Sequence, residues 1–242
     1  MAKVERTVDM CGIAGWFGRP DSGDAEAMRK DIRHRGPDGS KISQSNEVTF
    51  IHTRLAIIDP SESGAQPMEL PVPETGLDLE EQTKERGNGS SSQPKSIIVF
   101  NGEIYNFGEL RSALQALGDK FLSQSDTEVL LRLLLRDGSN ALPKLAGMFA
   151  FAYWNPQTRE GLLARDPFGI KPLYYRKDGS TLSFASESRA LQRKEDRLDP
   201  DAIRDFFLWG SVSEPQTFRK SIRQLPAGSL LRWRMGTLEI EK

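Results

Sequence analysis

The run MFAFAYWNP, residues 148–156, decides the fold class of this chain. Its aromatic residues Phe149, Phe151 and Tyr153 alternate with small alanines, which is the period-2 pattern of a β-strand. The Asn-Pro pair at the end of the run stops the strand. Bulky side chains would therefore cover one face of this strand and small side chains the other.

Further strand-like runs lie on both sides of this one, with turn residues between them. They are CGIAGWFG (11–18), VTFIHTRLAIID (48–59), IIVF (97–100), GLLARD (161–166), PLYYR (172–176), TLSFAS (181–186) and a weakly alternating tail from 222 to 240. The later runs follow one another at hairpin spacing, which favours antiparallel pairing.

Helices are expected at 24–33, 105–117, 129–135 and 200–208. Ser125 and Glu128 fit a capping box ahead of the third helix, and Asp199 with Pro200 fits the start of the fourth. Strands, then helices, then more strands predict an α+β fold with largely antiparallel sheets. A βαβ dinucleotide-binding fold is not indicated.

Composition excludes several classes of protein. The 242 residues carry 33 Lys+Arg and 34 Asp+Glu, a net charge of -1, which predicts no nucleic-acid or anionic membrane partner. One cysteine and two histidines rule out a disulfide scaffold and disfavour a metal site. With no apolar run long enough to cross a bilayer and no signal peptide, we expect a cytoplasmic protein.

Cys11 is the only thiol, and a lone cysteine is commonly a small buried hydrophobe. Met10 before it, and small glycine and alanine residues after it, instead suggest an initiator methionine ahead of the true first residue. A cysteine at a free N-terminus carries its own base, because an α-amine titrates at about 7.7–8.0. Such an amine could take the thiol proton without any histidine.

Ten blocks in order resemble one known family. They are MCGIAGWFG, RHRGPDG (33–39), HTRLAIID (52–59), GAQPM (64–68), NGEIYNF (101–107), SDTEVLL (125–131), GMFAFAYW (147–154), ARDPFGIKPLYY (164–175), FASESRAL (184–191) and QLPAGS (224–229). The chain resembles the class II glutamine amidotransferase domain of glutamine-hydrolysing asparagine synthetases, an N-terminal-nucleophile hydrolase. The resemblance covers about 11–231 and implies a four-layer αββα sandwich of two antiparallel sheets.

The resemblance implies roles for three catalytic residues. Cys11 would attack the side-chain amide of L-glutamine. The Asn101 side chain and the Gly102 backbone N–H would form the oxyanion hole that the tetrahedral intermediate needs. Taken without the resemblance, Asn101-Gly102 would be an ordinary hairpin turn.

The resemblance also implies a substrate pocket that reads both ends of an amino acid. Arg54 would bind the α-carboxylate, and Asp126, assisted by Glu103, the α-ammonium. The stretch from Leu55 through Ala56 and Ile57 to Ile58 would line the pocket. Without the resemblance, Arg54 would be a surface arginine, and Asp126 an acid favoured by the helix dipole.

Other conspicuous residues are expected to be structural. His34 and His52 have no set of metal partners nearby in the sequence. Arg33, Arg35 and Asp38 would order a loop. ARDPFGIKPLYY is typical of the family and is expected to be a packed turn between strands.

The chain departs from the family at its ends and in one insertion. Residues 1–10 would be a leader, a propeptide or a misassigned start, because they block the amine of Cys11. Residues 69–95, rich in Pro, Gly, Ser and charge, predict a flexible insertion. Residues 232–242 would be a C-terminal tail or the start of a linker to a synthetase domain.

No pyrophosphate loop or Walker motif is present in the sequence. We therefore expect no cofactor in this chain, with ATP and Mg needed only by a synthetase domain or partner subunit that accepts the ammonia. Two alternatives stay open. The chain could be a non-catalytic amidotransferase-like module that regulates or scaffolds a synthetase, or it could feed ammonia to a different amidotransferase branch.

Overall fold

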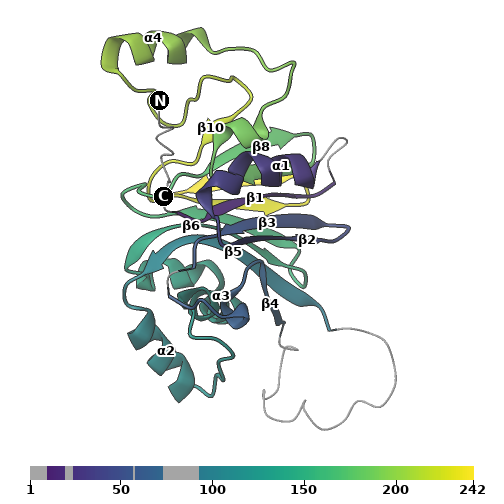
Figure 1. Ribbon diagram of the computed structural model, residues 1–242, viewed down its shortest axis with the longest axis vertical. Helices are drawn as coiled ribbons and strands as arrows, with labels where there is room; N and C mark the ends of the chain where they lie inside the picture. The colour runs from purple at the N-terminus through teal and green to yellow at the C-terminus, as the bar shows by residue number, and fades with distance from the viewer. Residues whose placement is uncertain (1–9, 20–23, 57, 73–92) are drawn as a thin grey trace, which may run out of the picture.

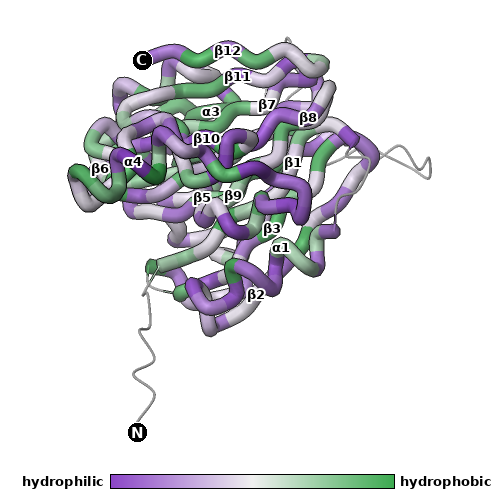
Figure 2. Tube along the Cα trace, turned by 90° about the horizontal axis from the view of Figure 1, so that it is seen from above, coloured by the Kyte–Doolittle hydropathy of each residue, from purple (hydrophilic) through white to green (hydrophobic). Residues whose placement is uncertain are grey.

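The computed structural model describes residues 10–19, 24–56, 58–72 and 93–242. Two six-stranded antiparallel sheets form the centre of the molecule, with α1 and α3 on opposite sides of the pair (Figure 1). The α+β fold and the four αββα layers predicted from the sequence are confirmed. Seen from above, β2 and β12 lie at opposite sides of the molecule (Figure 2).

The first sheet runs in the order β10-β8-β9-β1-β3-β2. Its strands are β1 (Gly12–Phe17), β2 (Gly39–Gln44), β3 (Val48–Arg54), β8 (Tyr174–Asp178), β9 (Thr181–Ala185) and β10 (Arg223–Gln224). The predicted strand over 48–59 ends at Arg54, five residues early. The reason is that the next backbone amides bond to side chains: Leu55 N–H donates to the Cys11 sulfur and Ala56 N–H to Asp38.

The second sheet runs in the order β12-β11-β7-β6-β5-β4. Its strands are β4 (Met68–Pro71), β5 (Lys95–Ile104), β6 (Gly147–Asn155), β7 (Glu160–Arg165), β11 (Leu230–Arg234) and β12 (Thr237–Glu241). The residues expected to be a tail or linker, 232–242, thus continue the sheet. The expected boundary at 231 falls inside β11, whose Leu231 pairs with Leu163 of β7.

Helices α1 and α3 pack against the two sheets, α2 packs against α3, and α4 stands apart from both sheets (Figure 1). The helices are α1 (Ala25–Ile32), α2 (Phe107–Ala116), α3 (Asp126–Asp137) and α4 (Pro200–Trp209), with short 3-10 turns η1 (Arg33–Arg35), η2 (Glu62–Gly64), η3 (Gly138–Lys144) and η4 (Ser188–Leu191). Ser125 caps α3 as predicted, accepting from Thr127 N–H. The other half of the capping box is wrong, because Glu128 accepts from the backbone N–H groups of Leu122 and Ser123.

The alternation in β6 sorts its side chains between two cores. Phe149, Phe151 and Tyr153 pack with α3 in the outer core of the second sheet. The alanines on the opposite face pack between the sheets, where Phe17 and Phe184 fill the space. The predicted division of this strand into a bulky and a flat face is confirmed.

The insertion predicted at 69–95 is shorter than expected. Glu69 and Pro71 at its start pair with Ile97 and Lys95 in the β4–β5 hairpin. Residues 73–92 lie outside the described part of the chain. No helix of the described residues is long and apolar enough to cross a membrane.

Candidate active site

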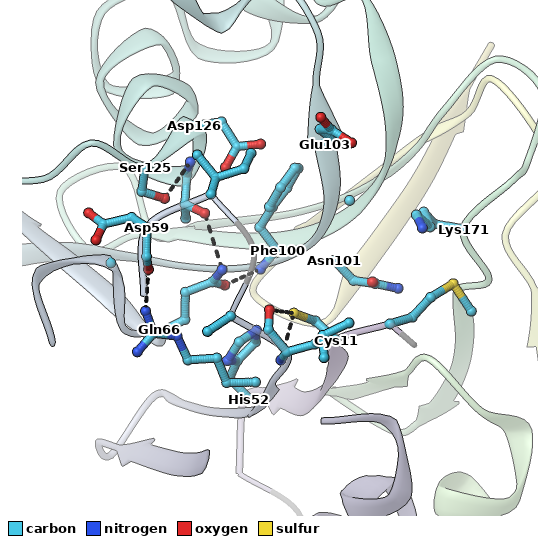
Figure 3. Close-up of a pocket in the computed structure, with 18 of the residues that line it drawn as sticks. Cys11, His52, Asp59, Gln66, Phe100, Asn101, Glu103, Ser125, Asp126 and Lys171 are labelled. Carbon is cyan, nitrogen blue, oxygen red and sulfur yellow. Dashed lines mark hydrogen bonds between the residues drawn. The ribbon is translucent and has the colours of Figure 1, made fainter. Parts of the chain in front are cut away.

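Cys11 directly precedes β1, at the mouth of a pocket between the two sheets (Figure 3). Its sulfur accepts a hydrogen bond from Leu55 N–H at 3.3 Å and lies 3.5 Å from the Leu55 carbonyl oxygen. Burial raises the pKa of the thiol, while the Leu55 backbone, Lys171, Arg35 and Arg54 act in the opposite direction. Cys11 is thus half-buried, and the positively charged groups that act on its thiol are Lys171, Arg35 and Arg54.

Arg35, expected to order a loop, holds the backbone of Cys11. Its Nε donates to the Cys11 carbonyl oxygen at 3.1 Å, and its Nη1 lies 3.3 Å from Glu187. Glu187 also contacts His34 at 2.6 Å. Asp38 fixes the facing segment by accepting from Ala56 N–H at 2.9 Å. The RHRGPDG turn thus braces both sides of the cysteine.

Asn101 lies in β5 and lines the same pocket as Cys11. It is only 1% exposed, and its Nδ2 has no hydrogen-bond partner among the described residues. A buried amide donor without a partner costs about 1–3 kcal/mol. Such an arrangement is typical of a donor kept for a ligand.

Gly102 follows in the same strand, where β5 and β6 approach closely. A Cβ at this position would lie 2.2 Å from the carbonyl oxygen of Met148 and 2.7 Å from Cα of Phe149. Only glycine fits without moving β6. The expected hairpin-turn alternative is wrong, because Asn101 and Gly102 both lie inside a continuous strand.

Arg54 ends β3 and lines the pocket. Its Nη2 donates to two backbone carbonyls, those of Asp59 and Ser61, the latter at 2.8 Å. The Asp59 carboxylate in turn accepts from Gln124 N–H at 2.9 Å, near the start of α3. Arg54 therefore orders the wall of the pocket, and any ligand would use its other donors.

Asp126 opens α3 and is 4% exposed. Its Oδ2 accepts from Ile104 N–H at 3.0 Å, which ties the helix to β5. Burial, with a smaller contribution from the negative charge of Glu103, raises the pKa of Asp126 to about 6, while the nearby backbone N–H groups act in the opposite direction. The carboxylates of Asp126 and Glu103 both line the pocket, where their negative charge would attract a cation.

Most residues expected to bind substrate come together in this pocket. Its lining includes Cys11, Arg54, Leu55, Ala56, Ile58, Asn101, Gly102, Glu103 and Asp126. Ile57 lies outside the described residues. Leu55, Ala56 and Ile58 line the pocket as irregular chain after β3, and not as the strand that we expected.

Gln66 is a pocket residue that sequence reasoning missed. It is buried, with Oε1 accepting from Phe100 N–H at 2.6 Å and Nε2 donating to Thr127 Oγ1 at 3.1 Å. The side chain thus joins the residue before Asn101 to the residue after Asp126. Its presence in the GAQPM block was the available signal.

Lys171 is the second residue that was missed. It was read as part of a packed turn, but it is 8% exposed and lines the pocket with Cys11 and Asn101. Burial lowers the pKa of Lys171 and Arg35 lowers it further, while Cys11, Asp166 and Glu103 act in the opposite direction.

His52, which was expected to be structural, lines the pocket, and neither of its ring nitrogens has a hydrogen-bond partner among the described residues. His52 is 1% exposed, and its pKa is lowered to about 3 by burial and by the charge of Arg54. His52 is therefore neutral at ordinary pH. Within the described ranges, no group of three or more His, Cys, Asp or Glu residues is placed to hold a metal ion.

Comparison with known proteins identifies the class. Residues 10–80 and 82–242 match the family described as glutamine amidotransferase domain. The chain belongs to this family, as its resemblance in sequence predicted.

Proteins of similar sequence indicate which branch of this family the chain resembles. The chain is 37% identical, over 91% of its length, to asparagine synthetase [glutamine-hydrolyzing] 1 of Bacillus subtilis, and 32% identical, over 96%, to a putative asparagine synthetase [glutamine-hydrolyzing] 2 of Methanocaldococcus jannaschii. It spans 33% and 46% of the length of those two proteins.

A solved structure has the same fold. The glutamine phosphoribosylpyrophosphate amidotransferase of B. subtilis, complexed with ADP and GMP, aligns with a TM-score of 0.65 at 21% identity, over 96% of this chain and 49% of its own. At this identity the likeness concerns the fold alone.

Proposed function

We propose that this chain hydrolyses L-glutamine to glutamate and ammonia, with Cys11 as the nucleophile. One observation carries the proposal. The sulfur of Cys11 shares a pocket with the buried Nδ2 of Asn101, which has no partner within the described part of the chain, and with a cationic and an anionic end. A nucleophile beside a donor kept for a developing oxyanion is the arrangement that acyl transfer needs.

The reaction would proceed in two balanced halves. The α-amine of Cys11 takes the thiol proton, and the sulfur attacks the side-chain carbonyl carbon of glutamine while Asn101 and the Gly102 N–H hold the oxyanion. The C–N bond breaks as the α-ammonium returns a proton, releasing ammonia and leaving a γ-glutamyl thioester. Water, deprotonated by the amine, then attacks the thioester, and glutamate leaves as the thiol re-forms.

The substrate would lie between two charges. Arg54 would bind the α-carboxylate, and Asp126 with Glu103 the α-ammonium. The wall ordered by Arg54 through Asp59 would set the distance between those ends. Leu55, Ala56 and Ile58 would contact the methylene chain, because they line the pocket between the charged groups.

The ammonia acceptor would be a synthetase domain or a partner subunit. The support is that the curated relatives are named glutamine-hydrolysing asparagine synthetases and are two to three times longer than the aligned region. The glutaminase half-reaction as written needs no cofactor. ATP and Mg²⁺ would be required only by the acceptor.

The mechanism requires a free amine on Cys11, which residues 1–10 would block. The test is therefore a cleavable fusion that releases a chain beginning at Cys11, assayed for glutamate and ammonia. We expect equal amounts of both products, none from Cys11→Ala, and little from the 242-residue chain. If the released chain binds glutamine but turns none over, the non-catalytic module is the better description.

A further inference from the structure

Lys171 is a buried cation for which the proposed reaction has no role. Its side chain enters the pocket from the same side as Asn101, opposite Gln66 and Asp59 (Figure 3). It makes no ion pair with the residues that the structure describes. Burying a lysine without a partner is costly, so its position calls for an explanation.

Asp166 fixes the backbone that carries this lysine. The Asp166 carboxylate is fully buried and accepts from the N–H groups of Phe168, Ile170 and Lys171 at 3.0–3.1 Å. Arg165 Nε donates to the Lys171 carbonyl oxygen at 2.8 Å. Two buried charged residues thus hold position 171 from both sides.

Apolar packing does not hold this turn. Phe168 is 84% exposed and Ile170 53% exposed, so the expectation of a packed turn is wrong. Gly169 has φ +64°, and a Cβ there would lie 2.9 Å from the Arg165 guanidinium. The polar contacts therefore maintain the turn. Within the turn, the side chain of Lys171 lines the pocket.

The other two cations around Cys11 each have protein partners, although Nη2 of Arg35 has none among the described residues. Arg35 pairs with Glu187 and donates to the Cys11 carbonyl. Arg54 donates to the backbone of the pocket wall. The anions facing Lys171 are Glu103 from β5, Asp166 with its carboxylate bound by backbone amides, and the ionised form of Cys11. Lys171 differs from both arginines because its ammonium group has no hydrogen bond or ion pair with any residue that the structure describes.

We propose that Lys171 stabilises the ionised sulfur of Cys11 from a position fixed by Asp166 and Arg165. This makes it a positioning residue that sets how readily the nucleophile forms. The inference rests on the proposed role of Cys11 as nucleophile. The pKa of the thiol agrees in direction, because burial raises it and Lys171 opposes that rise.

The test is the pH dependence of Cys11 alkylation by iodoacetamide in the 242-residue chain. Cys11 is the only cysteine, its amine lies in a peptide bond, and the reagent is neutral, so the rate reports the thiol alone. In Lys171→Met we expect the midpoint to rise by about one pH unit, with a roughly tenfold lower rate below it. Lys171→Arg should restore most of the rate.

Lys177→Met is the matched control, since Lys177 is exposed on β8 and should leave the profile unchanged. Lys171→Gln serves as the second neutral variant if Lys171→Met does not fold. A midpoint unchanged in both neutral variants would overturn the inference, as would an arginine variant no better than methionine. Because alkylation needs no glutamine, a failure of the proposed function would leave this readout intact.

Discussion

The Nε of Arg35 donates a hydrogen bond to the carbonyl oxygen of Cys11 at 3.1 Å, so a buried guanidinium holds the backbone of the proposed nucleophile. Cys11 lines the pocket, and Arg35 lies behind it outside the lining. The contact fixes the direction in which the sulfur points. It also places a positive charge beside Cys11, and Glu187 balances that charge.

Arg35→Met should lower kcat for glutamine hydrolysis by about 10²-fold with a smaller effect on KM, because a displaced nucleophile loses orientation. Steady-state kinetics on the chain beginning at Cys11 measure this. Arg33→Met is the matched control, because Arg33 lies in the same turn and is exposed. Equal activity of the Arg35 and Arg33 variants would contradict the proposed anchoring.

Asp126 predicts a pH dependence of substrate binding. Its pKa of about 6 means that it loses its charge as the pH falls through 6, and with it the attraction for an α-ammonium. KM for glutamine should therefore rise below pH 6, while in Asp126→Asn it should be high and insensitive to pH in that range. A KM that stays flat from pH 7.5 to 5 in the unmodified chain would argue against this role.

The Asp126 carboxylate also predicts an effect on folding stability. A carboxylate in a salt bridge stabilises the fold when it is ionised, whereas the ionised form of Asp126 destabilises it. A pKa raised from 3.8 to about 6 means that the folded state binds the proton more tightly. The charge then costs about 3 kcal/mol above pH 6 and nothing below pH 3.8. Thermal melts should show Asp126→Asn more stable than the parent at pH 7.5, with the gap narrowing toward pH 4.5.

Gly102 and Gly108 offer a matched pair of substitutions. Gly102→Ala would drive a methyl group to 2.2 Å from the Met148 carbonyl, so β5 and β6 must separate beside Asn101. We expect a loss of several kcal/mol and no glutaminase activity. Gly108→Ala adds a methyl with nothing within 4 Å near the start of α2, and should stabilise by about 0.5–1 kcal/mol. Chemical denaturation of both variants checks the contrast.

The sequence allowed the fold to be predicted where local pattern and packing agree. The alternation from Phe149 to Tyr153 predicts β6 and both of its faces, because a strand between two cores needs different side chains on each. Cys11 could be singled out because its chemistry depends on its neighbours Met10 and Gly12. The end of β3 at Arg54 could not be predicted, because the hydrogen bonds that end the strand are made by the side chains of Cys11 and Asp38.

Two pocket residues that depend on distant contacts, Lys171 and Gln66, were not predicted. Lys171 looks like any turn lysine until Asp166 and Arg165 are seen to hold its backbone, and Cys11 lies 160 positions earlier in the chain. Gln66 bonds to residues 34 and 61 positions away. No periodicity or spacing rule reports such pairings. They require the two sheets to be brought together first.

Gln66 supports the last prediction. Gln66→Leu keeps the volume but leaves the Phe100 N–H and the Thr127 hydroxyl without their buried partner, which should cost about 1–3 kcal/mol for each group. Because Phe100 precedes Asn101 and Thr127 follows Asp126, KM should rise together with the fall in kcat. Gln93→Leu is the control, since the one side-chain hydrogen bond of Gln93 to the residues in the described ranges goes to the Val72 carbonyl, at 3.0 Å. Denaturation and steady-state kinetics on both variants separate the effects. A Gln66 variant that loses stability but keeps its KM would show that the bridge supports the fold without placing the substrate residues.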